Sequence, residues 1–209
     1  MIRLSYLAAP LFLLAYGAAR LIDGRDGVHG PGPAWTIGHL LFLAGLLAYA
    51  VVLVGLYRIA VGRGGTARIL AGATLVAAYV GLAGFVQTVL IDLWVGLNAA
   101  DRAGMSQLYD QHDGLPILTT LGPLFQVGLL ILLVRIVLVR RGPWWSPVAL
   151  LLGNVALTVN LDLLPVGALL FLAALAPFAV GNRTGPTNRS APPNQRVSAT
   201  TRSTPPVLG

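Results

Sequence analysis

Long apolar segments separated by short polar loops occupy most of the first 180 residues of the chain. A helix of about 20 apolar residues can cross the hydrocarbon core of a bilayer, which is ~30 Å thick. Because the chain contains several such runs, the pattern predicts an all-α fold, a polytopic integral membrane helical bundle with six transmembrane helices. The predicted spans cover about residues 4–22, 34–59, 66–97, 115–139, 144–160 and 163–180.

The last two spans are predicted from one apolar stretch that is too long for a single helix. Asn160 and Asp162 interrupt this stretch, and Pro165 follows them. Residues of these types favour a tight turn, which would divide the stretch into two short spans. If residues 144–180 instead form one broken helix, the bundle has five spans and the C-terminal tail lies on the other side of the membrane.

Residues 1–19 also have some features of a cleaved signal peptide. Arg3 would be the basic start of such a peptide, and small residues lie at 17–19. The apolar run is long for a signal peptide, however, and Arg20 would directly follow the cleavage site. We therefore favour a transmembrane helix at the start of the chain.

The arginines are distributed asymmetrically over the predicted loops. Cytoplasmic loops of membrane proteins are enriched in Lys and Arg. With six spans and a cytoplasmic N-terminus, eleven of the 14 arginines fall on the cytoplasmic side. We therefore predict a multi-pass protein of a bacterial plasma membrane with both termini in the cytoplasm. The eleven are Arg3, Arg58, Arg63, Arg68, Arg135, Arg140, Arg141, Arg183, Arg189, Arg196 and Arg202.

The last segment, residues 181–209, is basic and rich in Pro, Ser and Thr, with few large apolar residues. Such a composition cannot bury enough surface to fold, which predicts a disordered cytoplasmic tail. The net charge of +7 is mainly a topology signal, so we expect no nucleic-acid partner. The expected partners are the lipid bilayer and, beyond it, another membrane protein or a second copy of the chain.

The composition excludes several chemistries. The chain is 56% hydrophobic and 10% charged, whereas soluble domains carry about 25% charged residues. It contains no Lys, no Glu and no Cys. These absences exclude a Walker-type phosphate lysine, a Schiff base to a cofactor, a thiol nucleophile and an HExxH zinc site. We expect no cofactor.

Asp92 is the first candidate for a functional residue. It lies at the outer end of a helical face lined with small residues, which includes Gly81, Gly84 and Thr88. Such faces allow close contacts between membrane helices, so the carboxylate should point into the bundle. We predict either a ligand-binding role for Asp92 or a structural ion pair with Arg20 or Arg102.

His39, Arg20 and Asp162 complete the candidate ligand-binding residues. His39 lies about one turn inside the outer end of the second span, while Arg20 and Asp162 fall in or beside predicted outer loops. Acidic residues gather on the outer side by default when arginines gather inside. The set therefore indicates an outward-facing site only if these side chains converge.

Gln126 and Asn154 are predicted to lie near the middle of the bilayer. Lipid offers no hydrogen-bond partner to an amide at this depth. We expect the faces carrying Gln126 and Asn154 to meet through an amide-to-amide hydrogen bond, as a structural polar contact. A polar pathway through the bundle is the alternative.

The segment from Tyr109 to Asp113 contains three potential metal ligands, Asp110, His112 and Asp113. Carboxylate and imidazole groups can bind divalent ions. The spacing matches no established metal motif, so these residues are weak candidates and we predict no metal site.

Three functions remain open on the sequence. The first is an integral membrane protein that binds a ligand or partner at its outer face, or supports a membrane assembly, without enzymatic activity. The second is a small transporter or permease component, supported by a faint repeat between residues 58–65 and 135–142. The third is an enzyme acting on lipid-linked substrates at the outer face, which requires two or more acid–base groups within hydrogen-bond reach.

Overall fold

The computed structural model describes residues 2–26, 29–62, 64–111 and 116–180. These residues form helices and contain no strand, which confirms the predicted all-α fold. Two 3-10 turns, η1 (Gly24–Asp26) and η2 (Leu161–Leu163), join longer helices. The α-helices are α1 (Ile2–Asp23), α2 (Pro33–Ala60), α3 (Gly65–Asn98), α4 (Arg102–Gln111), α5 (Pro116–Thr120), α6 (Leu124–Leu138), α7 (Trp145–Val159) and α8 (Leu164–Val180).

Five helical segments of the described chain are long and apolar enough to cross a membrane. They are α1, α2, α3, the α5–α6 segment Pro116–Leu138, and the η2–α8 segment Leu161–Val180. The sixth, α7, has 15 residues and is about 22 Å long at 1.5 Å per residue. The structure therefore supports a helical membrane bundle of five to six spans.

Residues 144–180 form two helices rather than one. α7 and α8 pack against each other as a hairpin, and η2 forms the turn between them. The Asn160 side chain accepts a hydrogen bond from the backbone N–H of Asp162 (2.9 Å) at this turn. The predicted tight turn is therefore present, and it depends on the polar residues that interrupt the apolar stretch.

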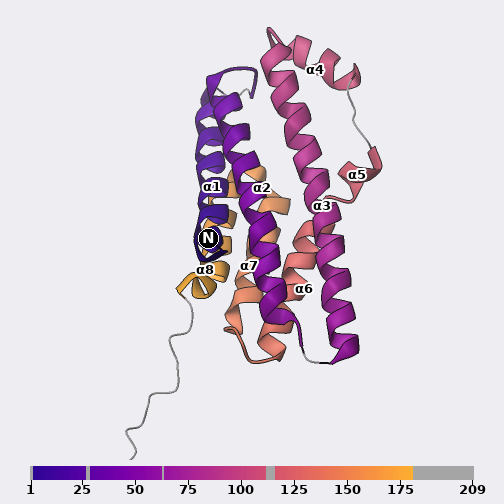
Figure 1. The fold of residues 1–209 in the computed structure, drawn as a ribbon. Helices are drawn as coiled ribbons and strands as arrows, with labels where there is room; N and C mark the ends of the chain where they lie inside the picture. Colours follow the sequence, from indigo (N-terminus) through magenta and orange to yellow (C-terminus); the bar gives the residue numbers. More distant parts are fainter. Residues whose placement is uncertain (1, 27–28, 63, 112–115, 181–209) are drawn as a thin grey trace, which may run out of the picture.

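The bundle helices form a closed ring. α1 lies between α2 and α8, α8 contacts α7, and α3 lies between α2 and α6. α6 also contacts α2 and α7, which completes the ring. Figure 1 shows that α1, α2 and α3 reach further towards one end than the α7–α8 hairpin does. The ring is therefore taller on one side than on the other.

Large side chains fill the ring most completely in the half where α2 ends and α3 begins. Several side chains of α2 and α6 are fully buried there, whereas many apolar side chains on the outer faces are exposed, such as Leu152 and Val76. An apolar outer surface of this extent is expected where lipid replaces water. The fully buried residues of this layer are Leu53, Leu56, Leu129, Leu132, Leu133 and Ile136.

Glycines bring α3 against the α5–α6 segment. A Cβ atom on Gly81 would lie 2.8 Å from the carbonyl oxygen of Gly122 and would overlap the backbone nitrogen of Phe125. A Cβ on Gly84 would overlap the carbonyl oxygen of Leu118. The small-residue face predicted on α3 is therefore a backbone-to-backbone contact.

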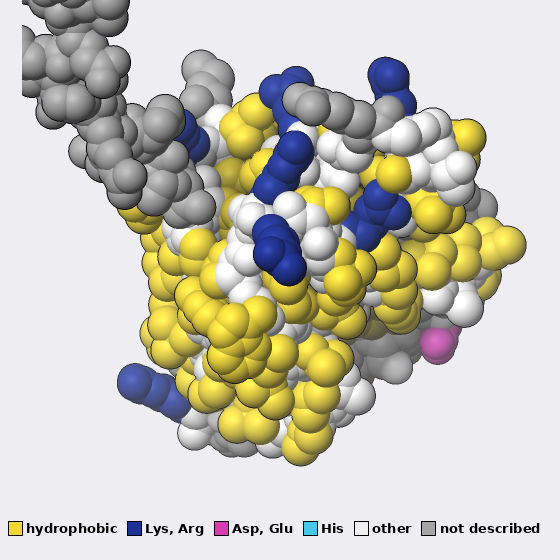
Figure 2. Space-filling view, turned by 90° about the horizontal axis from the view of Figure 1, so that it is seen from below, with side chains coloured by type: hydrophobic (Ala, Val, Ile, Leu, Met, Phe, Trp, Pro, Cys, Tyr) yellow, Lys and Arg dark blue, Asp and Glu magenta, His cyan; other side chains and the backbone are white. Residues whose placement is uncertain are grey.

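The two ends of the bundle differ in charge, although Arg20, Arg25 and Arg102 lie at the same end as most of the described acidic residues. We name the end formed by the α2–α3 and α6–α7 connections the arginine-rich end, because it carries Arg58, Arg68, Arg135, Arg140 and Arg141. Figure 2 shows arginine side chains spread over this face of the molecule. The opposite end, which includes η1 and α4, carries Asp23, Asp92, Asp101 and Asp110 and is named the acidic end.

Residues 181–209, which are predicted to be disordered, lie outside the described residues. Arg63, His112 and Asp113 also lie outside them.

Candidate ligand-binding site

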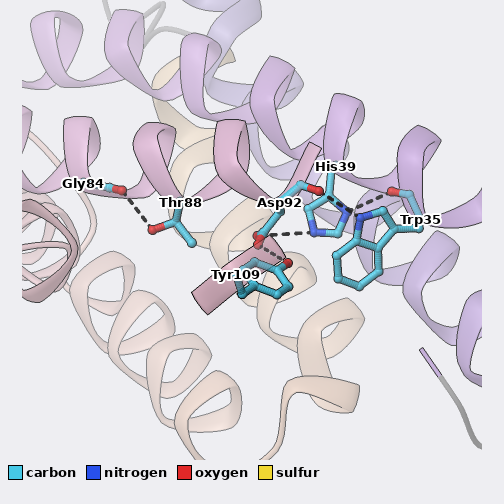
Figure 3. Close-up of polar contacts among 6 residues, drawn as sticks. All are labelled: Trp35, His39, Gly84, Thr88, Asp92 and Tyr109. Atoms are coloured by element: carbon cyan, nitrogen blue, oxygen red, sulfur yellow. Dashed lines mark hydrogen bonds and ion pairs between the residues drawn. The ribbon is translucent and has the colours of Figure 1, made fainter. Parts of the chain in front are cut away.

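Asp92 joins three helices at the acidic end. Its Oδ1 accepts a hydrogen bond from the Tyr109 hydroxyl on α4 (2.7 Å). Its Oδ2 lies 3.5 Å from Nε2 of His39 on α2. Its backbone carbonyl accepts a hydrogen bond from the Trp35 indole N–H (3.2 Å). Figure 3 shows these side chains converging on Asp92, and we name Trp35, His39, Asp92 and Tyr109 the Asp92 cluster.

His39 is almost fully buried, with 5% of its surface exposed. Its Nδ1 lies 2.8 Å from the carbonyl oxygen of Trp35, one turn earlier on α2. Both ring nitrogens therefore face oxygen atoms, since Nε2 faces Asp92. A protonated imidazole can donate to both oxygens, whereas a neutral one can donate to only one.

Close packing on a glycine positions Trp35 in this cluster. A Cβ atom on Gly96, one turn beyond Asp92, would overlap the indole ring of Trp35. The absence of a side chain at this position lets the indole approach α3 closely enough to reach the Asp92 carbonyl oxygen. Trp35 is therefore a structural partner of Asp92.

The structure brings Asp92 and His39 together but corrects the ion pair expected for Asp92. Among the described residues, Asp92 forms no ion pair with Arg20 or Arg102. Arg20 instead lies beside Asp162, with 3.7 Å between Nε and Oδ1. The expectation failed because the η2 turn of the short hairpin reaches the level of the last turn of α1, a height that segment lengths did not reveal.

The sequence predicted neither Trp35 nor Tyr109 as a partner of Asp92. Tyr109 lies between the predicted spans 66–97 and 115–139, in α4, which lies across the end of α3 (Figure 1). Met105, one turn before Tyr109, is 5% exposed. The spacing of these two residues, with polar residues around them, was the available signal for a short amphipathic helix.

The environment of Tyr109 favours its neutral form. Burial raises the pKa of the Tyr109 hydroxyl above its ordinary value of 10.0, and the hydrogen bond that it donates to Asp92 raises the pKa further. A raised tyrosine pKa means that the folded state holds the proton more tightly than the unfolded state does. The contribution to stability is therefore complete below about pH 10 and is lost as the pH rises through the folded-state pKa.

We expect the wild type to lose stability above about pH 10 more steeply than a Tyr109→Phe variant does. The variant lacks the group whose proton must be removed, so the difference between the two stability curves isolates Tyr109 from the other tyrosines. Thermal unfolding measured from pH 8 to 11.5, with the absorbance of tyrosinate followed in parallel, would check this. Parallel curves for the two proteins would contradict it.

The weak metal candidates are not brought together in the part that the structure describes. Asp110 is exposed on α4. No group of three or more His, Asp, Glu or Cys side chains capable of holding a metal occurs among the described residues. His112 and Asp113 lie outside them, so the predicted absence of a metal site stays a prediction.

A cavity of about 320 Å³ lies inside the ring, next to Arg20. The α7–α8 hairpin closes one side of it, and α1, α2, α3 and α6 form the rest. Polar side chains also line it, namely Thr88, Gln126 and Thr158, with Arg20. Its aromatic walls are Tyr16, Phe42, Tyr49, Phe85, Phe125 and Phe171.

Two residues that line this cavity carry a buried polar atom without a hydrogen bond. Nε of Arg20 and the hydroxyl of Tyr49 have no hydrogen-bond partner among the described residues, although Nε of Arg20 lies 3.7 Å from the Asp162 carboxylate. The Tyr49 side chain is 2% exposed and its ring packs edge-on against Phe125 (5.3 Å between centroids). A buried donor without a hydrogen bond costs about 1–3 kcal/mol, so a bound molecule that accepts a hydrogen bond from either group would offset this cost.

The predicted amide pair is only partly reproduced. Gln126 lines the cavity together with Thr158, which lies one turn after Asn154 on α7. Within the described chain, however, Oδ1 of Asn154 is buried and has no hydrogen-bond partner. The expected amide-to-amide bond is therefore not made to this oxygen. The predicted depth of the two residues in the bilayer stays a prediction, and their rotation about the helix axes did not follow from the sequence.

No family model, curated protein or solved structure matches this chain.

Proposed function

We propose that the protein is a non-enzymatic, multi-pass plasma-membrane protein that binds an amphipathic molecule in the cavity beneath Arg20. The observation that carries the proposal is the pair of buried donors, Arg20 Nε and the Tyr49 hydroxyl, that line one cavity without hydrogen-bond partners among the described residues. Its volume of about 320 Å³ lies within the range of small-molecule sites.

The chemistry of the walls indicates the class of ligand. Arg20 offers a cationic donor at the end of the cavity nearest the acidic end, where a carboxylate or another acceptor group could bind. Phe42, Phe85 and Phe125 form an apolar surface further inside. A ligand with an acidic head group beside Arg20 and an apolar body beside the phenylalanines would match this arrangement. Asp162 does not neutralise Arg20 fully, because it lies 3.7 Å away and is 55% exposed.

The proposal also includes an orientation of the protein in the membrane. The arginine-rich end faces the cytoplasm and the acidic end faces outwards, in agreement with the rule that cytoplasmic loops are enriched in arginine. In this orientation both termini are cytoplasmic and the ligand enters from the outer side. Association with a second copy or another membrane protein stays a prediction of the sequence.

The packing of leucine side chains beneath the cavity favours binding over transport. Tyr49 is the deepest α2 residue of the lining, and Leu53 and Leu56 follow it towards the arginine-rich end. Both leucines are fully buried, as are Leu129 and Leu132 of α6. A close-packed leucine layer offers no route for a polar molecule.

An enzymatic role is less well supported, although its first requirement is met. Asp92, His39 and Tyr109 do converge within or near hydrogen-bond reach. The cavity bordered by His39 is only about 10 Å³, which is close to the space that one water molecule occupies. We therefore assign the Asp92 cluster to holding α2, α3 and α4 in place.

A head-group competition would test the proposed function. The purified full chain in zwitterionic nanodiscs would be titrated with dodecanoate, dodecanol and dodecylamine, and thermal unfolding would be followed. We expect saturable stabilisation by dodecanoate above that by the alcohol, reaching about 2.7 kcal/mol at 100 times its dissociation constant. The amine should stabilise least, because its charge repels Arg20.

Arg20→Gln should remove the preference for dodecanoate, because it removes the cation at the cavity. Arg25→Gln is the matched control, since Arg25 is exposed on η1 at the same end and does not line the cavity. Equal responses to the three compounds in the wild type, or an unchanged preference in Arg20→Gln, would refute the proposal.

A further inference from the structure

The connection between α6 and α7 has an unusual residue at its turn. Arg140 has φ 56°, and it is the only residue other than glycine with positive φ in the described chain. The backbone N–H of Arg141 donates to the Ile136 carbonyl (2.9 Å) and that of Arg140 to the Val137 carbonyl (2.8 Å). Helices that end with this hydrogen-bond pattern usually place glycine in the left-handed position.

Arginine is a less favourable choice than glycine at this position, because its Cβ crowds the backbone when φ is positive. A glycine follows at position 142, but there it serves close packing: a Cβ atom would lie 2.7 Å from Ile136 and 3.1 Å from Phe178. Strained backbone positions occur preferentially at sites with a function. The positive φ of Arg140 therefore indicates a role for its side chain.

Arg140 and Arg141 line a second cavity, of about 610 Å³, at the arginine-rich end. The Nη1 atom of Arg141 donates a hydrogen bond to the Ile59 carbonyl at the end of α2 (3.1 Å). This bond fixes one guanidinium at the wall of the cavity. Trp145, Pro177 and Phe178 form the apolar part of the wall.

The position and lining of this cavity define the chemistry of its ligand. Two guanidinium groups are suited to a phosphate, which accepts paired N–H donors. Pro177 and Phe178 of this wall lie at the end of the Leu161–Val180 segment, which is long enough to cross a bilayer, where head groups meet acyl chains. We propose that this cavity binds the phosphate of an anionic membrane lipid, with its acyl chains along Phe178 and Pro177. A soluble phosphate compound would use the arginines but not this apolar wall.

The proposal is independent of the function assigned to the cavity at Arg20, because the two sites share no lining residue. It can therefore fail while that function stands, and the reverse also holds.

Arg140→Gly is the decisive variant, because stability and binding should move in different directions. Glycine adopts a positive φ without the strain that a Cβ atom causes, so we expect the melting temperature without added lipid to stay equal or rise. The affinity for dihexanoyl phosphatidic acid should fall roughly tenfold, the size expected when one charged hydrogen-bond donor is lost. Binding would be measured by native mass spectrometry and by thermal shift on the detergent-purified full chain.

Two further ligands and one control variant complete the test. Dihexanoyl phosphatidylcholine should bind more weakly than the phosphatidic acid, and inorganic phosphate should give no saturable shift. Arg68→Gln is the matched control, since Arg68 is exposed at the same end and does not line the cavity. It should keep the wild-type affinity. Phosphate binding as strong as lipid binding, an equal loss in Arg68→Gln, or a lower melting temperature in Arg140→Gly would each overturn the proposal.

Discussion

Replacing Gly81 by alanine should be the most destabilising single-methyl change in the protein, lowering the free energy of unfolding by roughly 3 kcal/mol. The added Cβ would overlap the backbone nitrogen of Phe125 and lie 2.8 Å from the Gly122 carbonyl oxygen. Backbone atoms cannot rotate away as a side-chain terminus can, so α3 and α6 must separate along their contact. Reversible unfolding of the purified protein in detergent would measure the change.

Gly72→Ala on the same helix is the matched control. No atom lies within 4 Å of a Cβ built at Gly72. Alanine there removes the conformational freedom of glycine without a clash, so stability should rise by up to about 1 kcal/mol. If both substitutions changed the stability by the same amount, glycine flexibility rather than close helix contact would be the explanation, and the α3–α6 contact would lose its importance.

Asp92→Ala should have the second-largest effect, a loss of about 2 kcal/mol. The substitution leaves the Tyr109 hydroxyl without its acceptor and removes the carboxylate that lies 3.5 Å from Nε2 of the buried His39. Asp92→Asn should lose less, because the amide oxygen can still accept from Tyr109. Thermal unfolding of the three proteins near pH 7 would rank them.

The control for Asp92 is Asp110→Ala, because Asp110 is an exposed acid on α4 at the same end. Its removal should change stability by less than about 0.5 kcal/mol. A second readout separates loss of the cluster from general weakening: the tyrosinate absorbance attributed to Tyr109 should appear at lower pH in Asp92→Ala. A titration unchanged from the wild type would show that Asp92 does not hold the Tyr109 proton.

The placement of Asp92 and His39 at the same end of the bundle could be predicted, because apolar run length determines how far a residue lies along a helix. The small-residue face of α3 was also readable, since Gly81 and Gly84 recur at helical spacing. Depth and face of single helices follow from such local patterns. They gave the helical membrane fold and two members of the Asp92 cluster.

What could not be predicted depends on the packing of one helix against another. The pairing of Arg20 with Asp162 requires the height of the η2 turn beside α1, which is set where Leu164 and Pro165 pack against Gly17. The positions of Gln126 and Asn154 depend on how α6 and α7 rotate. Tyr109 required recognition of a ten-residue helix outside the apolar runs, where hydropathy gives little signal.

The unequal heights of the helices have a consequence for the surrounding lipid. α3, with 34 residues, is about 51 Å long, whereas α7 has 15 residues. Lipid beside α7 meets an apolar surface shorter than the ~30 Å hydrocarbon core. Such hydrophobic mismatch is relieved by local thinning of the bilayer. We expect the leaflet at the acidic end to dip beside the hairpin, which would bring lipid head groups towards the depth of Arg20.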